Sequence, residues 1–165
     1  MDANIVEIKR FAVHDGDGIR TTVFFKGCPM RCLWCHNPET LSAERQLAFY
    51  RHKCTSCGKC AEICPSCHSI VEGIHTVNRA ECIGCGNCVA ACPQDALALF
   101  GETRSVDDIC AELLKDKCFY DESNGGITLS GGECLLQSDA CREILAEMKR
   151  NGVNTAVDTC GFVPQ

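Results

Sequence analysis

Three cysteines in one short loop have the spacing that points most directly to chemistry. Cys28, Cys32 and Cys35 follow an apolar run in the pattern C-x3-C-x2-C. A cubane iron–sulfur cluster has four irons and normally takes four cysteine ligands, so three cysteines leave one iron open to a small molecule. A structural zinc site is closed by four ligands, and zinc is the alternative for this loop taken alone. The spacing therefore predicts a four-iron cluster that binds a small molecule.

Eight further cysteines form a repeat in the middle of the chain. Each half reads C-x2-C-x2-C-x3-C-P, and the two halves supply Cys54, Cys57, Cys60 and Cys64, then Cys82, Cys85, Cys88 and Cys92. This is the bacterial two-cluster ferredoxin pattern, in which the fourth cysteine of each motif binds the other cluster. We expect one [4Fe-4S] cluster on Cys54, Cys57, Cys60 and Cys92, and another on Cys82, Cys85, Cys88 and Cys64. Zinc or disulfides are the alternatives, but neither requires this order.

Other possible ligands lie close to the first half of the repeat. Cys67 and His68 follow it directly, and His75 comes seven residues later. Because eight cysteines suffice for two clusters, we interpret Cys67 as a spare thiol near a cluster. We interpret His68 and His75 as histidines of the surface or of turns.

Composition favours a reducing, intracellular location. Seventeen cysteines in 165 residues would indicate a disulfide scaffold in a secreted chain. Residues 1–10, however, carry alternating charges and lack the apolar core of a signal peptide. No apolar run has the length of a membrane span, and the formal net charge of −6 disfavours nucleic acid as a partner. We expect a cytoplasmic protein that uses its cysteines as metal ligands and binds neither nucleic acid nor membranes.

The sequence around these loops alternates between strands and helices. Short apolar runs bounded by Gly or Asn predict strands at residues 20–26, 126–129 and 153–158. Apolar residues at helical spacing predict helices that begin at Ser105 and Ser138, with Cys110 and Cys141 as small core residues. Strands alternating with helices predict an α/β fold with a parallel sheet and right-handed crossovers.

The loop after the second predicted strand contains Ser130, Gly131, Gly132 and Glu133. Ligands of parallel sheets bind beyond the carboxyl ends of the strands. Two glycines let the backbone approach a ligand closely, and Glu133 can accept a charge-assisted hydrogen bond from an ammonium group. The loop could otherwise be an ordinary turn between a strand and a helix.

Together these motifs resemble those of the glycyl radical enzyme activating enzymes, which belong to the radical S-adenosylmethionine (SAM) superfamily. The cluster loop matches C-x3-C-x-aromatic-C, with Trp34 as the aromatic residue. Residues 15–28 and 35–39 are similar to the opening of that family, although Asp17 stands where a proline is usual. Residues 158–162 resemble its Asp-Thr-x-Gly motif, and Cys134 departs from the usual Pro or Ala after Gly-Gly-Glu.

The resemblance implies three [4Fe-4S] clusters together with SAM, whose amino and carboxylate groups bind the open iron. In some members a monovalent cation lies near the Asp-Thr motif. No side chain is catalytic in itself, because the cluster and its cofactor perform the chemistry. The resemblance assigns cofactor contacts to Trp34, Ser130, Gly131, Gly132, Glu133, Asp158 and Thr159.

The resemblance also implies a function. Such an oxidoreductase reductively cleaves SAM to a 5′-deoxyadenosyl radical, which removes a hydrogen from the Cα of one glycine in a partner glycyl radical enzyme. The expected partners are that enzyme and an electron donor of the flavodoxin or ferredoxin type. An iron–sulfur electron-transfer protein is one alternative, but it leaves Cys28, Cys32 and Cys35 unexplained. An inactive cluster-binding fragment of an activase is the other.

The implied fold of this family is a partial barrel of six βα units. Residues 1–50 are then the start of the radical SAM core, 51–100 an inserted ferredoxin-like 2[4Fe-4S] domain, and 101–165 the continuation of the core. The sequence reaches just past the third predicted strand of that barrel. We therefore expect the first half of a partial (β/α)6 barrel, truncated at the carboxyl end. As an isolated chain it should cleave SAM slowly at most and should not activate a glycyl radical enzyme.

Overall fold

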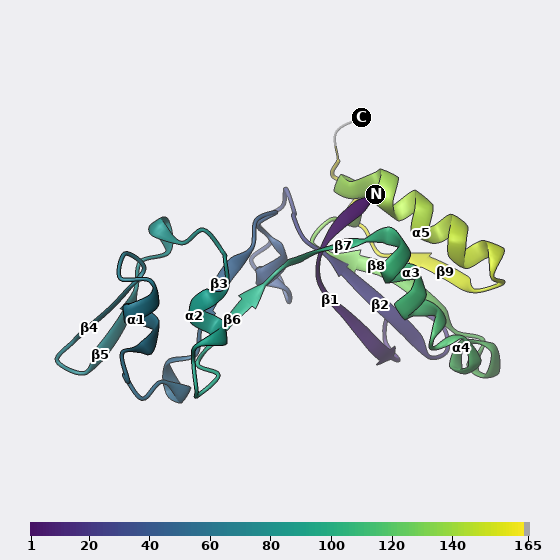
Figure 1. Ribbon diagram of the computed structural model, residues 1–165. Helices are drawn as coiled ribbons and strands as arrows, with labels where there is room; N and C mark the ends of the chain where they lie inside the picture. Colours follow the sequence, from purple (N-terminus) through teal and green to yellow (C-terminus); the bar gives the residue numbers. More distant parts are fainter. Residues whose placement is uncertain (164–165) are drawn as a thin grey trace. The chain divides into compact units, whose positions relative to one another are not determined.

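The computed structural model describes residues 1–163 and divides into two compact units. The first unit joins residues 1–44 to the segment that begins at Gly101, and the second unit spans residues 45–100. Figure 1 traces both units along the sequence. The second unit is therefore inserted into the chain of the first.

The first unit is built on a five-stranded mixed sheet in the order β7-β1-β2-β8-β9. Its strands are β1 (Asp2–Ala12), β2 (Arg20–Phe25), β7 (Glu102–Ser105), β8 (Gly126–Gly131) and β9 (Asn154–Val157). The strands β2, β8 and β9 are parallel, whereas β1 pairs antiparallel with both β2 and β7. The α/β class is confirmed, and the three predicted strands are parallel. The antiparallel strands β1 and β7 were not expected. Within residues 1–163 the sheet stays open, with β7 and β9 at its edges.

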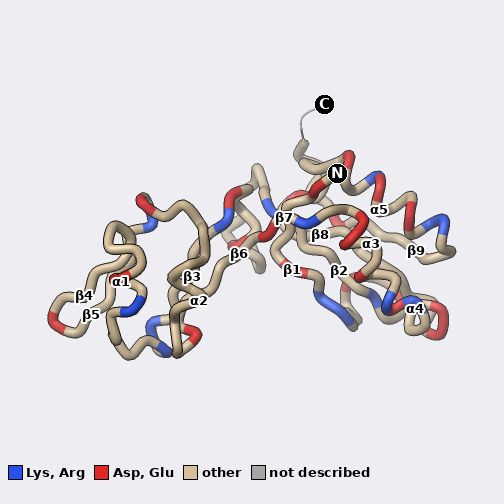
Figure 2. The backbone as a smooth tube through the Cα atoms, in the orientation of Figure 1, with Lys and Arg blue, Asp and Glu red and all other residues tan. Residues whose placement is uncertain are grey.

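Helices follow the strands of the first unit. They are α3 (Val106–Leu114), α4 (Lys117–Ser123) and α5 (Ser138–Arg150), with short 3-10 turns η1 (Pro38–Thr40) and η4 (Cys134–Gln137). The Ser105 hydroxyl caps α3 by accepting a hydrogen bond from the Asp108 amide at 3.0 Å. Charged residues of both signs occur along α5 (Figure 2), and Arg142 pairs with Asp139.

The core of the first unit lies between this sheet and its helices. Ile109 and Leu113 of α3 and Ile144 and Met148 of α5 are fully buried in the same cluster as the apolar residues of β2 and β8. Cys110 and Cys141 are buried in the same cluster, so the prediction that they are core residues is confirmed. This packing fixes the carboxyl ends of the parallel strands, where the candidate site lies.

The second unit repeats one local pattern twice. Each motif follows a 3-10 turn, η2 (Arg51–Lys53) or η3 (Arg79–Glu81), and continues into a short helix, α1 (Lys59–Ile63) or α2 (Asn87–Ala90). Two antiparallel pairs complete it, formed by β3 (Gln46–Phe49) with β6 (Leu97–Phe100) and by β4 (His68–Val71) with β5 (Ile74–Val77). Leu47, Cys60, Cys88 and Leu97 form its small core. No helix within residues 1–163 has both the length and the apolar character to cross a membrane.

Candidate functional site

A buried carboxylate links two loops at the carboxyl ends of β8 and β9. Glu133 is fully buried, and its oxygens accept hydrogen bonds from the Thr159 hydroxyl at 2.7 Å and the Cys160 amide at 2.8 Å. The Ser130 hydroxyl donates to the Asp158 carboxylate at 2.8 Å. The structure thus brings together Ser130, Glu133, Asp158 and Thr159, although the two segments lie about 26 residues apart in sequence.

The electrostatics of Glu133 favour the ionised form. Burial alone would raise the pKa of this carboxyl, but hydrogen bonds from Cys160, Thr159 and the backbone outweigh it and lower the pKa. The Cys160 thiol also donates to Glu133 at 2.9 Å, and the pKa of this thiol is raised mainly by that bond. Sequence reasoning missed Cys160 because it occupies a variable position of its motif. Glu133 is therefore an anion that holds the second loop in place.

The glycines of the Ser130–Glu133 loop allow close contact with β2. A Cβ atom on Gly131 would lie 2.2 Å from the Phe25 nitrogen, and one on Gly132 would lie 2.3 Å from the Gly27 oxygen. The Glu133 amide donates to that same Gly27 oxygen at 2.8 Å. We expected these glycines to admit a ligand. In the structure the close neighbour is instead the backbone that leads into the cluster loop.

The cluster loop leaves the sheet at the same end. Its base is closed by hydrogen bonds from Gly27 and Cys28 to the carbonyls of Thr40 and Leu41, at 2.7 and 3.1 Å. The thiols of Cys28, Cys32 and Cys35 are free and partly exposed. The Trp34 side chain is 78% exposed, so its assigned cofactor contact has no support from packing within this unit. The three loops therefore converge at one end of the parallel strands.

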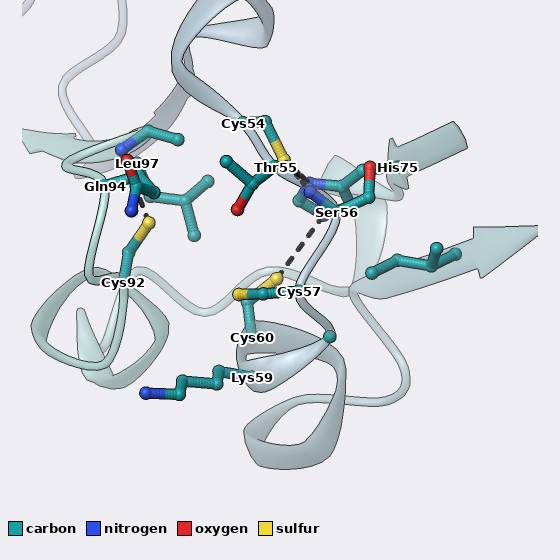
Figure 3. Close-up of a pocket in the computed structure, with 13 residues that line it drawn as sticks. Cys54, Thr55, Ser56, Cys57, Lys59, Cys60, His75, Cys92, Gln94 and Leu97 are labelled. Atoms are coloured by element: carbon teal, nitrogen blue, oxygen red, sulfur yellow. Dashed lines mark hydrogen bonds between the residues drawn. The ribbon is translucent and has the colours of Figure 1, made fainter. Parts of the chain in front are cut away.

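In the second unit, four cysteines from both motifs line one cavity. Figure 3 shows Cys54, Cys57, Cys60 and Cys92 around the same space. A second cavity is lined by Cys64, Cys82, Cys85 and Cys88, with the buried Cys67 beside them. These are the two sets that the ferredoxin rule predicts. All seventeen cysteines are free thiols, so the donors suit two four-iron clusters; the ligation itself stays a prediction.

Two histidines lie between these cavities instead of on the surface. His68 and His75 are 2% and 4% exposed, so the interpretation of them as surface or turn residues is wrong. They face each other across the β4–β5 hairpin, with His68 Nδ1 3.0 Å from His75 Nε2. Glu72 and Gly73 have the positive φ values of a tight turn, and the hairpin that they close brings the two histidines together.

Comparisons with known proteins show similarity to iron–sulfur domains and to activating enzymes. Residues 14–59 match the model of a 4Fe-4S single cluster domain, and residues 75–98 match that of a 4Fe-4S binding domain. The benzylsuccinate synthase activating enzyme of Thauera aromatica is 47% identical over 98% of this chain and 50% of its own length. The chain is homologous to the glycyl radical enzyme activating enzymes.

Two further activating enzymes support the same relationship. The choline trimethylamine-lyase activating enzyme of Oleidesulfovibrio alaskensis is 41% identical over 99% of this chain and 54% of its own length. The (2S)-3-sulfopropanediol sulfolyase activating enzyme of Bilophila wadsworthia is 45% identical over 97% of this chain and 54% of its own length. The chain spans about half the length of the activating enzymes it matches.

Proposed function

We propose that this chain supplies the cluster-binding and SAM-binding part of an activase that acts on a glycyl radical enzyme. The observation that carries the proposal is the convergence of three loops at one end of β2, β8 and β9. Glu133 joins them, through its amide to the cluster loop and through its carboxylate to the loop after β9. When bound, the cluster and SAM supply a 5′-deoxyadenosyl radical, which takes a hydrogen atom from a glycine Cα of the partner.

The residues of the chain have distinct parts in this proposal. Cys28, Cys32 and Cys35 hold three irons of the cluster and leave the fourth open. Glu133 provides negative charge for an ammonium group in a buried environment, where a charge-assisted hydrogen bond is strong. Asp158 and Thr159 support the loop beside it and are where we place the monovalent cation.

The second unit is proposed to carry two further [4Fe-4S] clusters that relay electrons from a flavodoxin or ferredoxin-type donor. Its two four-cysteine cavities support this role. They would equally suit a protein that only transfers electrons, but such a protein has no use for a third, three-cysteine loop. We also propose that β2, β8 and β9, which are parallel neighbours in the sheet, begin a partial (β/α)6 barrel.

A cleavage assay tests the proposal. Protein reconstituted with iron and sulfide without oxygen is mixed with dithionite and SAM, and 5′-deoxyadenosine is quantified by chromatography. We expect 5′-deoxyadenosine from the natural sequence and none above background when Cys28, Cys32 and Cys35 are all replaced by Ala. Cys118→Ala, at an exposed thiol, is the matched control and should leave the yield unchanged. Equal yields from the triple variant and the natural sequence would refute the proposal.

A further inference from the structure

A pair of buried imidazoles connects the two cavities of the second unit. His75 lines the cavity of Cys54, Cys57, Cys60 and Cys92 (Figure 3). His68 lines the cavity of Cys64, Cys82, Cys85 and Cys88. The two rings are joined by the 3.0 Å contact between His68 Nδ1 and His75 Nε2. His75 Nδ1 in turn lies 3.4 Å from Cys54 Sγ.

The hydrogen bonds of this pair have a defined direction once Cys54 is a cluster ligand. A neutral imidazole carries one N–H, on either Nδ1 or Nε2. A ligating thiolate only accepts hydrogen bonds, so the contact with Cys54 Sγ requires the proton of His75 on Nδ1. His75 Nε2 then accepts from His68 Nδ1.

The opposite arrangement of the two protons is unfavourable. It would leave the bare lone pair of His75 Nδ1 3.4 Å from the Cys54 thiolate, a shorter contact than the 3.6 Å between His75 Nε2 and Cys60 Sγ. The favoured arrangement leaves His68 Nε2 as an acceptor, and this atom is the buried side-chain nitrogen without a hydrogen-bond partner in residues 1–163. An unpaired acceptor there agrees with a His68 proton that is committed to His75.

The second motif has no counterpart of this pair. The sequence offset between the motifs is 28 residues, and the positions 28 residues after His68 and His75 are Ala96 and Thr103. All five histidines of the chain occur at or before position 75. The histidine pair therefore makes the two otherwise similar cluster sites chemically unequal.

We propose that His75, held by His68, donates a hydrogen bond to Cys54 Sγ and raises the reduction potential of the cluster in that cavity above that of its neighbour. Reduction adds negative charge to the cluster and its sulfurs, and hydrogen bonds to the sulfurs stabilise that charge. An electron in this unit then resides on the cluster beside His75. His75 is a positioning residue, and the proposal rests on the cluster assignment proposed above.

The test is a redox titration of the full chain in which Cys28, Cys32 and Cys35 are Ala, so that two clusters remain. His75→Phe removes the donor but can keep the ring contact with Phe49, whose centroid lies 4.5 Å away. We expect reduction of one cluster to become about tenfold less favourable, which is about 59 mV for one electron. The reduction potential of the other cluster and the iron content should stay unchanged. His52→Phe, at an exposed histidine, is the matched control and should shift neither potential.

Further readouts separate the possible failures. The reduced cluster should show hyperfine coupling to an exchangeable proton that His75→Phe abolishes. If His75→Phe fails to hold iron, His68→Phe decides, because it keeps His75 and should lower the same potential by a smaller factor. Unchanged reduction potentials in a variant with full iron content would overturn the role of His75 but not the cluster assignment. The protein with only Cys28, Cys32 and Cys35 replaced should hold about eight irons. If it did not, the cluster assignment would be overturned as well.

Discussion

At the scale of single residues, Glu133 connects chemistry with folding. A carboxylate offers about four lone-pair positions, and five donors in the described chain point at them. They are the amides of Leu135, Cys160 and Gly161, the Thr159 hydroxyl and the Cys160 thiol. Such a saturated, buried anion costs little to keep ionised because its hydrogen bonds replace the lost water. An incoming ammonium group would compete with the weakest of these donors, the Cys160 thiol. Glu133 therefore has a structural task whether or not a ligand is bound.

The first prediction concerns this carboxylate. Glu133→Gln removes the charge and should weaken SAM binding by about 1.5–3 kcal/mol, the range for a hydrogen bond to a charged group. Iron content should not change, because Glu133 is not a cluster ligand. Binding is measured by equilibrium dialysis of the reconstituted protein. Glu143→Gln, at an exposed position of α5, is the control, and equal affinities of the two variants would contradict the role of Glu133.

A second prediction concerns Asp116, which ties two strands to α4. It is 2% exposed, pairs with Arg10 of β1 and accepts from the Thr21 hydroxyl of β2 at 2.8 Å. Asp116→Asn should lower the free energy of unfolding by about 1.5–3 kcal/mol at pH 7. Asp121→Asn, which breaks the exposed pair with Lys117, should cost only about 0.5 kcal/mol. Urea unfolding measures both, and similar losses would contradict the assignment.

The pH dependence of this pair has a defined sign. The hydrogen bond from Arg10 lowers the pKa of Asp116 below the usual 3.8. A carboxyl whose pKa is lower in the folded state stabilises the protein at pH values above its pKa in the unfolded state. This stabilisation is lost as the pH falls through its pKa in the folded state. The difference in free energy of unfolding between the natural sequence and Asp116→Asn should therefore stay constant from pH 7 to about pH 5. It should become smaller as the pH falls below the usual pKa of an aspartate.

At the scale of elements, the sequence predicted the strands and helices whose apolar residues follow a clear local pattern. The strands β2, β8 and β9 and the helices α3 and α5 were expected because apolar runs and helical stripes mark them. β1 was missed because its charged residues obscure the alternation, and β7 because it has no apolar core residues of its own. Their pairing is set by tertiary contact with β2 and the chain start.

The close approach of Gly131 to β2 gives a third prediction. Gly131→Ala would place a Cβ atom against the Phe25 backbone at a φ of 117°, and should cost about 3 kcal/mol or more. Gly152→Ala is a matched control, because its φ is 72° but its Cβ would meet nothing within 4 Å. It should cost only about 1–2 kcal/mol. Equal urea midpoints of the two variants would show that the contact is not tight.

At the scale of the whole molecule, some features of the candidate sites follow from the spacing of the cysteine motifs. Others arise only from tertiary contacts. The two cavities bring together the cysteine sets expected from the motifs, because ferredoxin ligation follows local spacing and one exchange rule. The Glu133 bond to Cys160 and the burial of His68 and His75 were not expected. They depend on contacts across a hairpin or between strand ends, which no motif in the sequence encodes.

The division into two compact units gives the last prediction. Reconstituted protein should hold about twelve irons per chain as three four-iron clusters. Replacing Cys28, Cys32 and Cys35 by Ala should lower this to about eight, because the ligands of the other two clusters all lie within residues 45–100. Cys110→Ala and Cys141→Ala, at core thiols, are the controls and should leave iron content unchanged.

Replacing cluster ligands of the second unit tests the same independence of the two units. Changing Cys54, Cys57 and Cys60 to Ala should again remove about four irons and leave the cluster loop filled, because that loop is closed by hydrogen bonds within the first unit. Iron and sulfide analysis with electron paramagnetic resonance of the reduced samples distinguishes the losses. If either triple variant lost all its iron, the two units would have to assemble their clusters together. A natural sequence that held one or two zinc ions instead would reject iron–sulfur ligation in both units.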